Sequence, residues 1–189
     1  MRQAALDTLD SLHWVKGPQG KAFGKEFSAY SDAVQGTPCQ SGSVALWAAL
    51  RLLDIGPGDE VLVPSLTYIA TATCVSLCGA TPVFVDVEPS YWCVDLASME
   101  AARTPRTKAV IAVHLFGQVC DDDLVEWCEE HGIAYIEDAA QAHGAVAGDG
   151  RKAGGVGDVA CFSFFPSKNL AVGGEGGMMT TRREDLAAR

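Results

Sequence analysis

The stretch IAYIEDAAQAHGA (residues 133–145), followed by VACFSFFPSKN (159–169) and GGEGG (173–177), decides the fold of this chain. Its first apolar run ends abruptly at Glu137 and Asp138, as in a buried parallel strand with an acidic side chain at its carboxyl end. VACFSF presents Ser163 in the same way, and Lys168 follows five residues later. Open α/β sheets bind ligands at the carboxyl ends of their strands. The sequence therefore predicts a carboxylate, a hydroxyl and an amine at one edge of a sheet.

Composition and charge limit the classes of protein to consider. The chain has 189 residues, of which 48% are hydrophobic and 20% charged, as in a folded soluble protein. A formal net charge of −10 argues against a general nucleic-acid or anionic-membrane surface, because phosphates would be repelled. No apolar stretch has the length of a membrane span, and MRQAALDTLD (residues 1–10) lacks the apolar core of a signal peptide.

The seven cysteines form no CxxC pair, and most lie in apolar runs. Buried free thiols in a reducing compartment explain this pattern better than disulfides do. A zinc site is disfavoured, because the usual ligand spacing is absent. We therefore expect a cytoplasmic protein without a metal site.

Strands and helices are predicted to alternate from residue 41 onward. Residues 1–35 read as a polar, partly helical entrance segment whose aromatic residues pack on the core, and residues 36–189 as the ligand-binding domain. Strands are predicted at 60–65, 81–87, 108–116, 133–136, 159–164 and 178–181, and helices at 44–53, 66–79, 95–103 and 121–132. This order is typical of a three-layer α/β/α fold with a mostly parallel sheet.

Other polar and aromatic side chains lie near predicted strand ends and helix starts. Ser41-Gly42-Ser43 begins a helix whose first N–H groups could bind an anion, with plain N-capping by serine as the alternative. Tyr68 could cover a flat ligand or pack against the core. His114 ends a strand, where a structural role is at least as good an explanation. Taken alone, Asp138 could cap a helix and Lys168 could be a solvated surface amine.

The set as a whole suits a site for pyridoxal 5'-phosphate (PLP). Lys168 would bind this cofactor as a Schiff base and then act as general base and acid. Asp138 would keep the pyridine nitrogen protonated, and Gln141 would reach the phenolic oxygen. The phosphate and the ring face would be held by Gly42, Ser43, Ser163 and Tyr68. P-loop nucleotidases, dinucleotide-binding Rossmann enzymes and serine hydrolases are disfavoured, because their glycine-containing motifs are absent in the required context.

Several long blocks in the same order resemble the DegT/DnrJ/EryC1/StrS family of sugar aminotransferases, which are fold-type I PLP enzymes. The blocks are SGSVALWAALRLLDIGPGDEVLVPSLTYIATA, GATPVFVDVEP, TKAVIAVHLFGQ, IEDAAQAHGA and GDVACFSFFPSKNLAVGGEGG. The resemblance implies that Lys168 is the Schiff-base lysine and that Asp138 and Gln141 contact the cofactor ring. It places Gly42, Ser43 and Ser163 in the phosphate cup and Tyr68 in the ring-stacking position. Ser43 stands where threonine is more usual.

The resemblance also implies an activity. The family generally transfers an amino group from glutamate or glutamine to a nucleotide-linked keto-sugar. A few relatives carry histidine instead of the lysine and act as dehydrases, so Lys168 favours the aminotransferase branch. A dehydrase or lyase reaction and a non-catalytic binding or regulatory remnant are the alternatives. Family members are about twice this length and form homodimers, so we expect this chain to be the N-terminal portion, without the smaller C-terminal domain.

Overall fold

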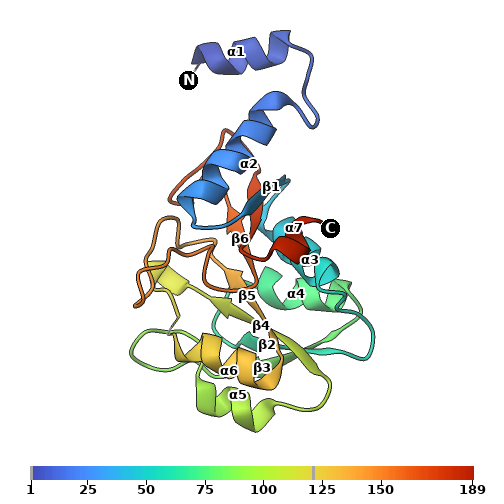
Figure 1. The fold of residues 1–189 in the computed structure, drawn as a ribbon, viewed down its shortest axis with the longest axis vertical. Coiled ribbons are helices and arrows are strands. Elements are labelled where there is room, and N and C mark those ends of the chain that lie inside the picture. The colour runs from blue at the N-terminus through green and yellow to red at the C-terminus, as the bar shows by residue number, and fades with distance from the viewer. Residues whose placement is uncertain (1, 121) are drawn as a thin grey trace.

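A seven-stranded sheet runs through the computed structural model, which describes residues 2–120 and 122–189 (Figure 1). The order across the sheet is β1-β7-β6-β5-β4-β2-β3. Strands β2 to β6 run parallel to one another, whereas β7 is antiparallel to both β6 and β1. The strands are β1 (Gln35–Cys39), β2 (Glu60–Pro64), β3 (Thr81–Val85), β4 (Thr107–Val113), β5 (Ala134–Asp138), β6 (Val159–Ser163) and β7 (Gly177–Thr181).

Helices cover both faces of the sheet, so the predicted three-layer α/β/α fold with a mostly parallel sheet is confirmed (Figure 1). One face is covered by α3 (Gly42–Leu52), α4 (Ala70–Leu77) and α7 (Glu184–Ala187). The other is covered by α2 (Pro18–Tyr30), α5 (Leu96–Ala102) and α6 (Asp123–His131). Asp121, at the start of the predicted helix 121–132, lies outside the described residues.

The central strands are apolar on both sides because each side faces a layer of helices. In β2, Leu62 packs into the cluster beneath α5 and α6, whereas Val61 and Val63 pack into the cluster beneath α3 and α4. In β6, Phe162 packs into the cluster beneath α5 and α6, and Cys161 packs into the cluster beneath α3 and α4. This alternation follows from the two-residue period of a strand. It is the reason that short continuous apolar runs in the sequence predict these strands.

Three elements differ from the sequence prediction. The predicted strand 108–116 ends at Val113, and Leu115–Gly117 form a short 3-10 helix. Strand β1 is not predicted, because its sequence QGTPC contains glycine and proline and its residues are exposed or half-buried at the sheet edge. The predicted helix 66–79 begins only at Ala70, since residues 65–69 form a bend after β2. That bend brings Thr67 and Tyr68 to the ligand edge instead of placing them within a helix.

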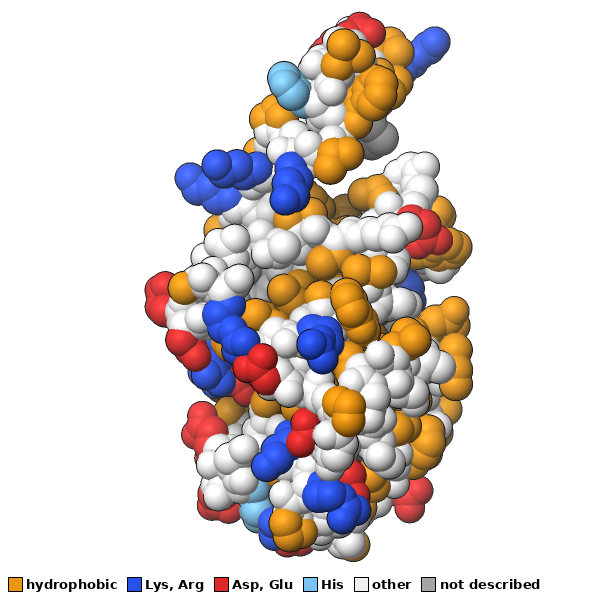
Figure 2. Space-filling model, turned by 90° about the vertical axis from the view of Figure 1, so that its right-hand side faces the viewer, with side chains coloured by type: hydrophobic (Ala, Val, Ile, Leu, Met, Phe, Trp, Pro, Cys, Tyr) orange, Lys and Arg blue, Asp and Glu red, His pale blue; other side chains and the backbone are white. Residues whose placement is uncertain are grey.

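The N-terminal helix α1 (Arg2–Asp10) stands away from the sheet (Figure 1) and has no buried residue. Hydrophobic side chains gather on this arm (Figure 2), and Leu12 and Val15 just after the helix are 71% and 84% exposed. Phe27 in α2 is buried and packs on Phe162 and Phe164, as predicted for the entrance segment. Among the described residues, no helix combines the length and the hydropathy of a membrane span.

Candidate active site

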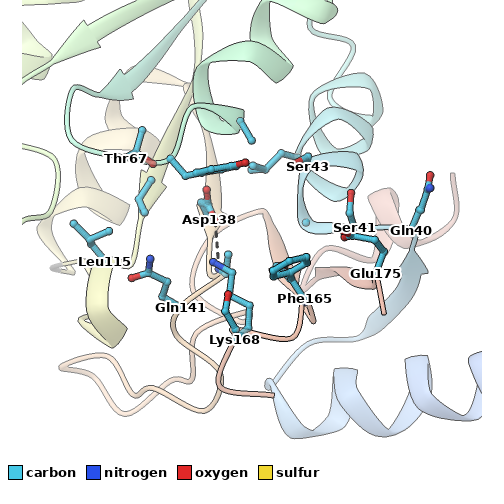
Figure 3. Close-up of a pocket in the computed structure, with 18 residues that line it drawn as sticks. Gln40, Ser41, Ser43, Thr67, Leu115, Asp138, Gln141, Phe165, Lys168 and Glu175 are labelled. Carbon is cyan, nitrogen blue, oxygen red and sulfur yellow. Dashed lines mark hydrogen bonds between the residues drawn. The ribbon is translucent and has the colours of Figure 1, made fainter. Parts of the chain in front are cut away.

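A cavity of about 690 Å³ opens at the carboxyl edge of the parallel strands (Figure 3). It lies between the ends of β4, β5 and β6 and the beginning of α3. The lining residues that were not singled out from the sequence include Gln40, Thr67, Phe165, Ser167 and Glu175. All seven site residues predicted from the sequence line it: Gly42, Ser43, Tyr68, Asp138, Gln141, Ser163 and Lys168. The sheet therefore brings together side chains that lie up to 126 positions apart in the sequence.

Asp138 lies at the end of β5 with its carboxylate at the floor of this cavity (Figure 3). Thr71 donates its hydroxyl to Oδ2 at 3.0 Å, and the Ala140 amide donates to Oδ1 at 3.3 Å. Burial raises the pKa of Asp138 above its usual value, opposed by these two hydrogen bonds and by the charge of Lys168. The segment after β5 forms turns, so Asp138 does not cap a helix. A buried carboxylate at the floor of a cavity is suited to holding a positively charged ligand atom.

The neighbouring Glu137 has a different role. Its carboxylate is fully buried and accepts hydrogen bonds from His114 Nε2 (2.9 Å) and from the amides of Gly154 (2.8 Å), Val156 (2.9 Å) and Gly157 (2.7 Å). Burial works to raise the pKa of Glu137, but the bonds from His114 and the amides outweigh it and hold the pKa below its usual value. Glu137 thus anchors the loop that precedes β6.

His114 is a structural histidine. Its Nδ1 accepts a hydrogen bond from the Cys120 amide at 3.3 Å, so its Nε2 carries the hydrogen that faces Glu137. The side chain is fully buried and does not line the cavity. Of the two explanations that the sequence left open, the structural one is therefore correct.

The beginning of α3 forms a close-packed cradle. The Ser41 side chain caps the helix by accepting from the Val44 amide at 3.3 Å, which leaves the Ser43 hydroxyl at the cavity. A Cβ atom on Gly42 would lie 2.8 Å from Cβ of Ser163, and one on Gly177 would lie 2.4 Å from the Ser41 carbonyl. The first amides of a helix have no partner within it and attract anions. Because glycine has no Cβ atom, β6 and β7 can approach the start of α3 closely at these two positions.

Lys168 lies on a loop that is fastened at its base. The buried Phe164 donates its amide to Gly176 at 2.8 Å and accepts from the Val172 amide at 3.0 Å, so residues 164–176 leave and rejoin the sheet at one point. Lys168 N in turn donates to the Phe165 carbonyl at 2.8 Å. The lysine side chain lies half-buried beside the cavity, near Asp138 and Phe165 in Figure 3. It is not a fully solvated surface amine.

Gln141 and Tyr68 complete the walls. The carbonyl oxygen of Gln141 accepts a hydrogen bond from the Phe116 amide at 2.8 Å, which leaves its NH₂ group as the donor for a ligand. Phe116 itself has a left-handed backbone conformation (φ 57°). Tyr68 is 73% exposed and lines the cavity, so it does not pack in the core. Its ring is available to cover a flat ligand.

These groups fit PLP. The helix start and the hydroxyls of Ser43 and Ser163 suit a phosphate dianion, as the glycine cradle leaves space for its oxygens. The buried carboxylate suits a protonated ring nitrogen, the Gln141 NH₂ suits a phenolic oxygen and the Lys168 amine suits an aldehyde. In the described chain, no group of three or more histidine, cysteine or acidic residues could hold a metal ion.

In fold, the chain is similar to solved aminotransferases. Superposition on DesV of Streptomyces venezuelae, solved in complex with a ketimine intermediate, gives a TM-score of 0.94 at 46% identity and covers 100% of this chain and 51% of DesV. The PLP form of the putative sugar aminotransferase Spr1654 of Streptococcus pneumoniae gives a TM-score of 0.86 at 33% identity and covers 96% of this chain and 50% of that chain. The fold is therefore that of fold-type I aminotransferases.

The family follows from the sequence comparisons. A model of the DegT/DnrJ/EryC1/StrS aminotransferase family matches residues 1–189, and the chain belongs to this family. The UDP-N-acetyl-3-dehydro-α-D-glucosamine 3-aminotransferase of Acidithiobacillus ferrooxidans is 49% identical over 179 residues. That match covers 94% of this chain and 48% of the relative, so the chain spans about half the length of such relatives.

Proposed function

We propose that this chain is the cofactor-binding portion of a PLP-dependent aminotransferase that transfers an amino group from glutamate or glutamine to a nucleotide-linked keto-sugar. The observation that carries the proposal is the meeting of Lys168 and Asp138 at one cavity with the amino end of α3. Membership of the family and the keto-sugar nucleotide named for the Acidithiobacillus relative support the substrate class. Lys168 disfavours the dehydrase alternative.

Each residue would have one task. When bound, PLP supplies an aldehyde that combines with amines and a ring that accepts electrons. The Nζ of Lys168 would hold the cofactor and, once displaced by the incoming amine, carry protons between carbon atoms of cofactor and substrate. Asp138 would keep the ring nitrogen protonated through its buried carboxylate. Gln141 would donate to the phenolic oxygen, and Tyr68 would shield the ring face from water.

The remaining residues would bind the phosphate. The start of α3 lies against the Ser163 end of β6, since a Cβ on Gly42 would lie 2.8 Å from Ser163 Cβ. Together with the Ser43 hydroxyl they would neutralise the dianion. This binding energy would fix the distance between the cofactor and Lys168.

Assembly and location are further parts of the proposal. We assign residues 36–189 to the large domain of the enzyme and residues 1–35 to an entrance segment. A homodimer is supported by exposed apolar side chains that follow cavity-lining residues in the chain. Ile69 follows Tyr68 and is 64% exposed, and Phe116 follows Leu115 and is 77% exposed. A cytoplasmic location is supported by seven free cysteines.

Reductive trapping tests the proposal. The purified chain is incubated with PLP and treated with borohydride, and the modified peptide is mapped by mass spectrometry. We expect one phosphopyridoxyl group on Lys168, which is absent in Lys168→Ala. Lys25→Ala, a change of an exposed lysine in α2, is the matched control and should label as the wild type does. Labelling spread over surface lysines in both this chain and a full-length enzyme would contradict the PLP assignment.

The transfer itself is tested on the full-length enzyme. Glutamate or glutamine should convert the bound cofactor to its amine form, which a keto-sugar nucleotide should return to the aldehyde form. Release of water from the sugar without net amino transfer would instead show the dehydrase reaction.

A further inference from the structure

A chain of two hydroxyl groups connects the cavity to Asp138. Thr67 Oγ1 lies 2.8 Å from Thr71 Oγ1, and Thr71 Oγ1 lies 3.0 Å from Asp138 Oδ2. Thr71 is fully buried in α4, whereas Thr67 lies in the bend before this helix and lines the cavity. Asp138 and Thr71 are 67 positions apart in the sequence, so only the fold joins them.

The direction of these hydrogen bonds is determined by the number of hydrogens available. An ionised carboxylate can only accept, so the single hydroxyl hydrogen of Thr71 is donated to Asp138. Thr71 must then accept from Thr67, whose hydrogen is directed inward. Asp138 Oδ1 is held independently by the Ala140 amide. Both oxygens of the carboxylate are thus fixed, one by the local backbone and one by the hydroxyl chain.

We propose that Thr71 is a positioning residue for Asp138, and that Thr67 acts through it by fixing the direction of the Thr71 hydroxyl. The pair keeps Asp138 ionised and aimed at the cavity, where, on the function proposed above, it holds the cofactor ring nitrogen protonated. A hydrogen bond to a buried carboxylate stabilises its charged form relative to its neutral form. Without the hydroxyl chain, Oδ2 would be a buried charged oxygen with no donor.

Other titratable groups also act on Asp138. Burial, followed by the nearby Asp138 charge, raises the thiol pKa values of Cys74 of α4 and Cys161 of β6, so both remain neutral. Lys168 favours the ionised form of Asp138 through its charge. None of these groups is altered by a change at Thr71. An effect of such a change on the titration of Asp138 can therefore be attributed to the hydroxyl.

Thr71→Val removes the hydroxyl and keeps the shape, Thr71→Ser keeps the hydroxyl, and Thr73→Val is the matched control at an exposed position of the same helix. The first measurement needs no cofactor: urea unfolding from pH 4 to pH 8. The folded-state pKa of Asp138 is raised above its usual 3.8, so stability falls as the pH rises from that value to the folded pKa. In Thr71→Val the folded pKa rises further, because the ionised carboxylate loses a hydrogen bond.

The loss of stability in Thr71→Val should therefore be large at pH 8 and small at pH 4, and Thr71→Ser should restore most of it. A loss that is equal at all pH values would mean that Thr71 only fills space, and would overturn the proposal. Failure of Thr71→Ser to restore stability would overturn it as well. Thr73→Val should change stability little at any pH.

A double-mutant cycle tests whether Thr67 acts on Asp138 through Thr71. Thr67→Val should raise the apparent pKa of Asp138 when Thr71 is present and have no effect on it in a Thr71→Val background. Equal effects in both backgrounds would show that Thr67 does not act through Thr71.

Absorption spectroscopy of the holoenzyme provides a second test of the proposal. The pH at which the absorption band of bound PLP changes should shift in Thr71→Val and not in Thr73→Val. If the wild type binds no PLP at Lys168, the proposed function fails, while the urea experiment still decides on the hydroxyl chain.

Discussion

Replacing Glu137 by glutamine changes a single atom in the most heavily hydrogen-bonded side chain beside the cavity. Its two carboxylate oxygens accept four hydrogen bonds, two on Oε1 from Val156 and Gly157 and two on Oε2 from His114 and Gly154. In Glu137→Gln one of these oxygens becomes an NH₂ group that faces two donors. Two hydrogen bonds to a charged group are then lost, each worth about 1.5–3 kcal/mol.

We expect Glu137→Gln to lower the free energy of unfolding by about 3–6 kcal/mol at pH 7, from the loss of two such bonds. The cost should depend on pH. The pKa of Glu137 is lowered in the folded state, so its contribution is fully present above the usual value of 4.5 and is lost as the pH falls through the folded value. The difference from wild type should therefore shrink in acid.

Urea unfolding followed by circular dichroism at pH 7 and below pH 4 measures both effects. Glu130→Gln, an exposed position on α6, is the control and should change stability by less than about 0.5 kcal/mol. A Glu137→Gln variant as stable as this control, or one whose deficit grows in acid, would refute the reasoning that the carboxylate is ionised and anchors the loop before β6.

Three further outcomes are expected. Gly42→Ala should weaken binding of PLP more than binding of pyridoxal, because its Cβ would lie 2.8 Å from Ser163 Cβ in the phosphate cradle. Equal losses of affinity for the two compounds in fluorescence titrations would show that the phosphate does not bind at this cradle. Tyr68→Ala should weaken PLP binding by about two- to tenfold and Tyr68→Phe should not, since the aromatic ring makes the contact; a loss in the phenylalanine variant would instead implicate the hydroxyl. Burial raises the pKa of the Cys74 thiol to about 12. At pH 8, Ellman's reagent should therefore modify Cys74 far more slowly than the half-buried Cys39. Mass mapping that finds Cys74 labelled first would contradict this burial.

Local patterns were enough to predict the parallel core of the sheet and its ligand edge. Runs such as Glu60–Pro64 and Val159–Ser163 are buried throughout, and a continuous apolar run bounded by polar residues predicts such a strand without any knowledge of its neighbours. The seven predicted site residues meet because parallel strands deliver their carboxyl ends to one edge. Their individual roles remain predictions.

What the sequence could not predict depends on contacts between distant segments. Thr71 lies among small and β-branched residues of α4 and shows no local sign of its bond to Asp138, 67 positions away. Strand β1 forms because β7 pairs with it, and its own residues do not favour a strand. The sequence predicted Asp138 at the cavity, but it did not predict that Glu137 would bind His114 and the loop before β6. Such a prediction requires knowledge of which face of β5 each side chain occupies.

Because Glu137 and Asp138 are adjacent, the register of β5 against β4 determines which of the two acids faces the cavity. In the present pairing with β4, Glu137 lies opposite Ala112 and Asp138 opposite Val113. Sliding β5 by one residue would turn every side chain to the other face and exchange the two acids. The shorter aspartate would then occupy the space built for the buried glutamate, and the longer glutamate would enter the cavity. An insertion or deletion in the turn between α6 and β5 would thus alter the reactive centre without changing any residue in it.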